Sequence, residues 1–192
     1  MCADTVTPPT FFARRDYPSA GGFPSVGDVN GDGIPDIVAV GLSETVSVLL
    51  GNGNGTFRSA IDAGPSWENM TGGVLLDLNG DGKLDLVIAG GPNGHRAPCG
   101  IGVCFGNGDG TFQLPVLYQA GSDIFANNPV VGDFNGDGIP DVVEAGSSGV
   151  WLFTGKGGGV FNPGVVYSSQ PELFPVGRCQ CGFQRRRKTL TW

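Results

Sequence analysis

The sequence predicts an all-β protein built from about three four-stranded antiparallel blades, with a stray N-terminal strand and an incomplete ring. A nine-residue motif, D-x-N-G-D-G-x-x-D, occurs three times in the 192 residues. A Gly-rich turn that ends in Phe also occurs three times, and short apolar runs rich in β-branched residues lie between these landmarks. Repeats of about 40–50 residues with four strands each are the sequence signature of β-propeller blades.

The nine-residue motif, called the Asp loop below, covers residues 28–36, 77–85 and 133–141. It places oxygen-bearing side chains at positions 1, 3, 5 and 9 of a tight loop, which is how a chain wraps a hard cation such as Ca²⁺. Ligands without His or Cys favour Ca²⁺ over Zn²⁺, and over Mg²⁺ less decisively. A plain hairpin is the alternative, because Asn-Gly and Asp-Gly form turns without metal. That alternative gives no reason for Asp at positions 1 and 9 in all three copies.

Each blade is expected to contain four strands in a fixed order. Strand A precedes the Asp loop and strand B follows it, while strand C ends at the Gly turn and strand D begins at the Phe that closes this turn. Short β-branched runs bounded by Gly, Asn and Asp favour strands over helices. Strand B is expected at 36–40, 85–89 and 141–145, strand C at 46–50, 101–105 and 150–153, and the start of strand D at Phe57, Phe112 and Phe161.

These landmarks divide the chain into consecutive parts. Thr10-Phe11 with Tyr17 is spaced like Thr111-Phe112 with Tyr118, which predicts a lone D-type strand from a blade that is otherwise missing. Because propellers typically close with about 4–8 blades, three blades are expected to need further blades or self-association. The expected parts are an extension (1–9), the lone strand and its connection (10–22), three blades (23–72, 73–128 and 129–177) and an aberrant tail (178–192).

The last fifteen residues differ from the rest of the chain. Val176-Gly177 stands where a fourth Asp loop is expected, but a basic stretch with Cys179 and Cys181 follows. Suitable codons for these residues, read one base later, can encode the start of another Asp loop. We therefore expect residues 178–192 to be a frameshift product. A genuine disordered basic tail that contacts anionic surfaces is the alternative.

Charge and composition narrow the classes of function. Residues 1–177 hold all 18 acidic and 6 of the 11 basic residues, a net charge of −12, which argues against nucleic acid as a partner. No apolar run reaches the roughly 18 residues of a membrane span, and no signal peptide is expected in this chain. There are five cysteines, of which Cys99 and Cys104 could pair if oxidised, so they do not settle the compartment.

The Asp loops, followed by apolar strands and by the Gly turn G-N-G-D-G-T-F, resemble the FG-GAP/VCBS repeat family of integrin-α-like propeller blades. The resemblance covers roughly residues 10–170. It implies about three Ca²⁺ ions, one in each hairpin between strands A and B, with four side chains and one backbone carbonyl as ligands. Carried over, the sets are Asp28, Asn30, Asp32, the Ile34 carbonyl and Asp36; Asp77, Asn79, Asp81, the Lys83 carbonyl and Asp85; and Asp133, Asn135, Asp137, the Ile139 carbonyl and Asp141.

The opposite face of a propeller, formed by the D–A and B–C connections, is expected to carry a ligand site. Aromatic residues beside amides and charges suit a glycan or a protein ligand, although the same aromatic residues could instead fill gaps between blades. The only His, in an insertion of the second repeat, has no spacing that suggests a Ser-His-Asp or Cys-His catalytic site. The candidates on this face are Trp67, Glu68, His95, Arg96, Phe125 and Phe174.

The sequence therefore predicts a non-enzymatic, Ca²⁺-stabilised propeller segment that is secreted or displayed at the cell surface. The expected function is an adhesion module or a glycan- or protein-binding scaffold. The propeller part of a secreted carbohydrate-active enzyme is the alternative, because paired carboxylates outside the Asp loops can support glycoside chemistry.

Overall fold

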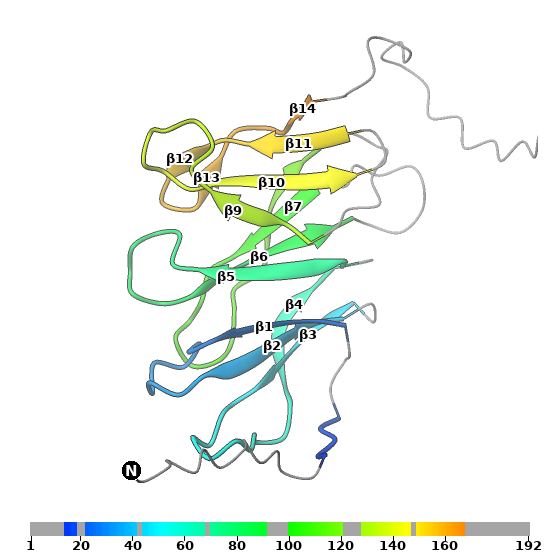
Figure 1. Ribbon diagram of the computed structural model, residues 1–192, viewed down its shortest axis with the longest axis vertical. Helices are drawn as coiled ribbons and strands as arrows, with labels where there is room; N and C mark the ends of the chain where they lie inside the picture. Colours follow the sequence, from blue (N-terminus) through cyan, green and yellow to red (C-terminus); the bar gives the residue numbers. More distant parts are fainter. Residues whose placement is uncertain are drawn as a thin grey trace, which may run out of the picture.

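The computed structural model describes residues 14–18, 22–41, 44–67, 70–91, 100–120, 128–146 and 149–167. In these ranges the regular elements are all strands, and they form three four-stranded antiparallel sheets that stack one on another (Figure 1). The stack does not close into a ring, so the predicted fold of β-propeller blades in an incomplete ring is confirmed. No helix of the described ranges has the length and hydropathy needed to cross a membrane.

Each sheet follows the chain order, with strand A at one edge and strand D at the other. Blade 1 contains β1 (Phe23–Gly27), β2 (Asp36–Val40), β3 (Thr45–Leu49) and β4 (Ile61–Ser66). Blade 2 contains β5 (Gly72–Leu76), β6 (Asp85–Gly90), β7 (Gly100–Cys104) and β8 (Val116–Gln119). Blade 3 contains β9 (Val130–Gly132), β10 (Asp141–Gly146), β11 (Gly149–Phe153) and β14 (Val165–Tyr167), with a small hairpin of β12 (Gly155–Gly157) and β13 (Val160–Phe161). Blade 2 begins at Gly72, one residue before its expected start.

Glycine is required in the two kinds of turn for different reasons. In the first Asp loop, Gly31 and Gly33 have φ angles of +75° and +80°, a region that side-chain-bearing residues rarely adopt, although open space surrounds both. In the Gly turn, Gly51 lies against the backbone carbonyl of Pro35, where a Cβ would clash. The Gly turn can therefore close onto the Asp loop of its own blade.

The blades pack face to face, because alternate residues of each strand point to opposite faces of the sheet. Two apolar clusters result. The first junction, between blades 1 and 2, buries Val29, Val38, Val40, Val46, Val48, Ala63, Trp67, Met70, Leu86, Ile88, Cys104 and Phe112. The second junction, between blades 2 and 3, buries Leu78, Val87, Ile101, Val103, Ala120, Val142, Phe153 and Phe161.

The segment before blade 1 lies against the first Gly turn. Residues 14–18 have no strand pairing in the structure, while residues 10–13 of the expected lone strand lie outside the described residues. The ring of Tyr17 meets the ring of Phe57 edge to face, with centroids 5.6 Å apart. The Phe57 amide also donates to the Tyr17 hydroxyl at 3.2 Å. Tyr17 thus fixes this segment on blade 1.

Candidate metal sites

The first Asp loop is folded around the carboxylate of its first residue. Asp28 Oδ1 accepts hydrogen bonds from the amides of Gly31 and Asp32, and its Oδ2 accepts one from Gly33 at 2.8 Å. Asn30 Oδ1 accepts from the Asp32 amide at 3.0 Å, and Asp32 Oδ1 accepts from the Ile34 amide at 2.9 Å. The loop backbone therefore curls so that successive amides point at the side chains expected to be ligands.

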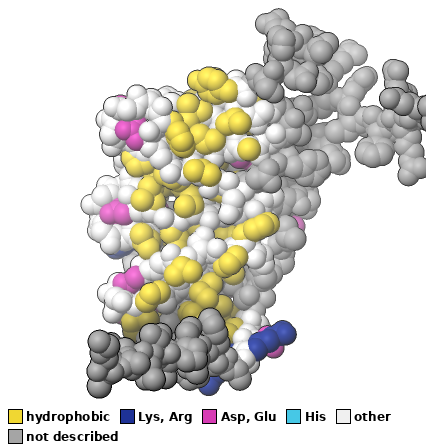
Figure 2. Space-filling view, viewed as in Figure 1, with side chains coloured by type: hydrophobic (Ala, Val, Ile, Leu, Met, Phe, Trp, Pro, Cys, Tyr) yellow, Lys and Arg dark blue, Asp and Glu magenta, His cyan; other side chains and the backbone are white. Residues whose placement is uncertain are grey.

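The other two loops repeat this pattern bond for bond. In the second loop Asp77 accepts from three loop amides, and in the third loop Asp133 does the same. The distances agree with those of the first loop within about 0.1 Å. Acidic side chains accordingly form three separate groups along one edge of the molecule, one at the level of each blade (Figure 2). The geometry is a property of the motif and is independent of the blade that carries it.

The last Asp of each loop has a different environment from the first. Asp36, Asp85 and Asp141 are fully buried. In blade 1 the two oxygens of Asp36 accept from the amides of Val29, at 3.0 Å, and Gly51, at 2.8 Å. This carboxylate therefore ties the Asp loop to the Gly turn of the same blade. Asp85 and Asp141 do the same in blades 2 and 3, with Leu78, Gly106, Phe134 and Gly155 as donors.

The pKa values of Asp28 and Asp133 are shifted in the opposite direction to that of Asp85. The amide of Gly33, followed by other loop amides, holds the pKa of Asp28 below its ordinary value, and the amide of Gly138 does the same for Asp133. Burial raises the pKa of Asp85, and its amide donors only partly offset that rise. Burial also raises the pKa of Cys104 to about 12, so the thiol is protonated at neutral pH. Cys104 is a free thiol, and Cys99 lies outside the described residues.

The loop residues retain the donor capacity that a hard cation needs. A carboxylate has about four lone-pair sites and an amide oxygen has two. After its hydrogen bonds, each expected side-chain ligand of the first loop keeps at least one site: one on Asp28 Oδ2, one on Asn30 and others on Asp32 and Asp36. Within the described ranges, no three Asp, Glu, His or Cys side chains are already gathered as a metal cluster. The oxygen ligands of each loop are of the type that Ca²⁺ prefers. In the structure their carboxylates accept hydrogen bonds from backbone amides.

The structure also locates part of the expected ligand face. Trp67 is only 9% exposed and belongs to the first junction, where its ring lies so close to Gly102 that a Cβ there would come within 3.1 Å of it. This placement matches the alternative role of filling a gap between blades. The other five candidates, Glu68, His95, Arg96, Phe125 and Phe174, lie outside the described residues.

Glu144 is a buried acidic residue that the sequence reasoning missed. It is fully buried in β10, and neither carboxyl oxygen has a hydrogen-bond partner in the structure described here. Burial raises its pKa to about 8. The sequence does mark Glu144 as unusual. The equivalent residues of the other two repeats, three positions after the last Asp of the loop, are the apolar Ala39 and Ile88.

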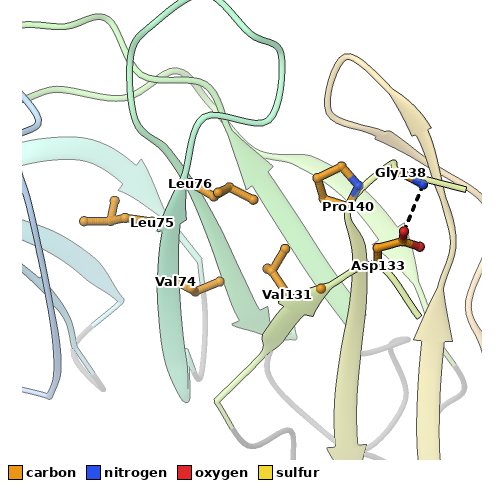
Figure 3. Close-up of a pocket in the computed structure, with 8 residues that line it drawn as sticks. Val74, Leu75, Leu76, Val131, Asp133, Gly138 and Pro140 are labelled. Carbon is orange, nitrogen blue, oxygen red and sulfur yellow. Dashed lines mark hydrogen bonds between the residues drawn. The ribbon is translucent and has the colours of Figure 1, made fainter. Parts of the chain in front are cut away.

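A cavity of about 310 Å³ lies at the second junction, between strands A of blades 2 and 3 (Figure 3). Apolar side chains dominate its wall, and Asp133 of the third Asp loop lies at its border. The Asp133 carboxylate is already bonded to the Gly138 amide at 2.9 Å. The lining residues are Val74, Leu75, Leu76, Val131, Gly132, Asp133, Gly138 and Pro140.

Comparisons with known proteins agree with this architecture. A solved structure of a lectin from Agrocybe aegerita, described as showing specific recognition of non-reducing terminal N-acetylglucosamine, is similar, with a TM-score of 0.52 and 26% sequence identity. The match covers 78% of this chain but only 38% of the lectin chain. Among curated proteins, none has a sequence that matches significantly. The family described as FG-GAP-like repeat matches residues 28–88 and 77–144, so this chain belongs to the FG-GAP-like repeat family.

Proposed function

We propose that this chain is a Ca²⁺-stabilised, non-enzymatic propeller segment that serves as an extracellular scaffold for binding a glycan or a protein. The observation that carries the metal part of the proposal is the identical hydrogen-bond geometry of three Asp loops built from oxygen ligands. Three carboxylates in each tight turn repel one another, and a divalent cation relieves that repulsion. The similarity to a lectin supports the binding part.

In this proposal the cation has a structural role. Asp28, Asn30, Asp32 and Asp36 would hold it in the first loop, and their counterparts would do so in the other two. Bound Ca²⁺ supplies positive charge that neutralises the loop carboxylates. Asp36 already links the loop to the Gly turn through Val29 and Gly51. A cation held by the same carboxylate adds its binding free energy to the stability of the hairpin pair.

A melting experiment tests the metal role. We expect the melting temperature to rise with Ca²⁺ and to fall again when EGTA is added, because only the folded loop presents all its ligands together. Asp32→Asn keeps an oxygen that can accept from the Ile34 amide but removes a charge, so it should reduce the Ca²⁺-dependent shift. Asp109→Asn is the matched control, because Asp109 is an exposed acceptor for Thr111 in a Gly turn and is not among the expected ligands. Equal melting curves with and without EGTA would reject the proposal.

The binding role is tested separately with a glycan array that includes terminal N-acetylglucosamine. We expect binding that is lost in Phe125→Ala or His95→Ala and retained in Phe134→Ala, since Phe134 lies in an Asp loop on the opposite face. The melting temperature of each variant shows whether it is folded. Polysaccharide turnover that depends on one carboxylate outside the Asp loops would contradict the non-enzymatic assignment and favour a carbohydrate-active enzyme.

A further inference from the structure

One aromatic contact is repeated where a blade meets the strand D that precedes it. Tyr118, in strand D of blade 2, lies against Phe161 of blade 3, with ring centroids 5.5 Å apart and planes at 79°. Tyr17 makes the same contact with Phe57 of blade 1, at 5.6 Å and 88°. Phe57 and Phe161 both close the Gly turn of their blade. Tyr17 therefore occupies on blade 1 the position that a preceding blade would fill with its strand D.

A third tyrosine, Tyr167, is at this position, and the described residues contain no blade beyond it. Tyr167 pairs with Val150 as Tyr118 pairs with Ile101, so the two tyrosines are equivalent in register. Tyr167 is 60% exposed and Val150 is 41% exposed, whereas Ile101 is fully buried. Phe134 is 51% exposed, while its counterpart in blade 2, Leu78, is 7% exposed. Blade 3 thus presents uncovered the face that blade 2 buries, and hydrophobic side chains gather at this end of the stack (Figure 2).

The matching surface in this chain is the outer face of blade 1. That face carries Ile37, Ala39 and Leu49, which correspond in register to the residues that blade 2 turns toward blade 1. Those counterparts are Leu86, Ile88 and Cys104, all buried in the first junction. Ala39 and Leu49 are each only 6% exposed, so an incoming blade has to displace what covers them.

We propose that blade 3 of one copy of this chain docks on blade 1 of a second copy, with Tyr167 stacked on Phe57 in place of Tyr17. Phe112 and Phe161 are already covered by blades of their own chain and are 5% and 4% exposed. Phe57 is covered by Tyr17, from a segment without strand pairing in the described residues, and this contact is the one that can be exchanged. The second copy repeats the blade-to-blade packing that the chain already uses twice.

This contact joins two different surfaces, so it is heterologous and leaves a free surface at each end. Association therefore continues past the dimer until a ring closes or a linear chain of copies grows. The segment carrying Tyr17 acts as an internal competitor, and its removal should favour association. The two equivalent tyrosines should consequently act in opposite directions when they are changed.

Sedimentation velocity and light scattering over a range of concentrations test this. Tyr167→Ala should weaken self-association by about two- to tenfold, the worth of an edge-to-face aromatic pair, and Val150→Lys should abolish it. Tyr17→Ala should strengthen self-association by freeing Phe57. Leu114→Ala is the control, because Leu114 is 77% exposed outside this face and should leave association unchanged.

Each other outcome overturns the proposal. Wild type and Tyr17→Ala that both stay monomeric at the highest concentration would show that the two faces do not meet. A dimer that never grows would indicate a self-complementary contact instead. If Tyr17→Ala and Tyr167→Ala change self-association in the same direction, the two tyrosines do not compete for Phe57. Far-ultraviolet circular dichroism of each variant shows that it is folded.

Discussion

The first and second junctions are built from equivalent positions of one repeat, yet they pack differently. At the first junction the Ser25 hydroxyl donates to the Gly73 carbonyl at 2.6 Å, and the Phe112 amide donates to Ala63 at 2.9 Å. At the second junction the bonds between blades are long: Tyr118 to the Gly159 carbonyl at 3.5 Å and the Gly164 amide to Gln119 at 3.4 Å. Good N–H···O bonds are about 2.7–3.2 Å long and good O–H···O bonds about 2.5–3.0 Å, so the first junction is the tighter one.

The residue directly before the Asp loop explains much of the difference in packing between the two junctions. Gly27 precedes the first Asp loop, and Leu75 and Leu84 of blade 2 pack against it so closely that a Cβ there would come within 2.6 Å of Leu84. Leu76 holds the equivalent position before the second loop. Its side chain points into the space between β5 and β9, where the cavity of about 310 Å³ lies (Figure 3). Two blades of the same repeat therefore pack closely or leave a cavity between them, depending on the residue before the Asp loop.

The second junction also contains Glu144 where the first contains Ile88. Exchanging these two residues measures how much each side chain contributes to the stability of its junction. Ile88→Glu should destabilise the protein by roughly 3–5 kcal/mol, because apolar burial is lost and a carboxyl group without a partner is buried. Urea unfolding measures the change, with Ile88→Val as the control at about 0.5–1.5 kcal/mol. A loss below that of the control would show that the first junction tolerates a carboxyl group.

The reverse exchange should have the opposite sign. Glu144→Ile removes two unsatisfied oxygens and fills the site with carbon, so we expect a gain of about 1–3 kcal/mol in the free energy of unfolding at pH 7. The same urea series measures it. A destabilised Glu144→Ile would mean that the carboxyl group makes a contact worth more than its burial costs.

Glu144 should also give the second junction a pH dependence. Its pKa is raised to about 8 in the folded protein from an ordinary 4.5. The folded state then keeps a proton that the unfolded state has lost, so stability is full below pH 4.5 and declines as the pH rises toward 8. The slope approaches about 1.4 kcal/mol per pH unit.

Subtracting the pH profile of Glu144→Gln from that of the wild type isolates this titration from those of the other acidic residues. The only cause of the Glu144 shift is burial, and no charge of a described residue contributes to it. Parallel profiles between pH 4.5 and 8 would show that the Glu144 carboxyl titrates normally and is hydrated.

The smallest expected effect concerns the cavity. Val131 of blade 3 is at the position equivalent to Leu75 of blade 2, and it lines the cavity. Val131→Leu adds one methylene group there and should stabilise the protein by about 0.8 kcal/mol. Val26→Leu, at the equivalent position in blade 1, is the control, because Val26 is 68% exposed and should show no gain. Equal effects of the two changes would show that the cavity is filled or too rigid to use the added group.

The blades themselves were predictable from the sequence, and the junctions were not. The Asp loop and the Gly turn carry their own hydrogen bonds and glycine conformations, so each copy specifies its hairpin locally. The role of Asp36 as a link to the Gly51 amide depends on how two hairpins meet, which spacing does not reveal. The sequence left open whether Trp67 faced a ligand or filled a gap between blades; it lies in the first junction, where its ring packs over Gly102.

The unsatisfied carboxyl group of Glu144 could have been noticed in the sequence as an acidic residue in an apolar strand. Its burial could not, because it depends on blade 2 covering β10. The exposed state of Tyr167 was likewise not readable from its own blade. It becomes clear only when Tyr167 is compared with Tyr17 and Tyr118, which are at the same position of the repeat but lie against Phe57 and Phe161.

Each Asp loop is proposed to hold one cation, so the number of Ca²⁺ ions bound per chain should equal the number of loops. Isothermal titration of the metal-free protein should give about three ions per chain, one for each loop. Asp81→Asn should reduce the count to about two, and the control Asp109→Asn should leave it at three. Titration heats that match a buffer blank, or a count that does not change in Asp81→Asn, would show that the Asp loops do not hold Ca²⁺.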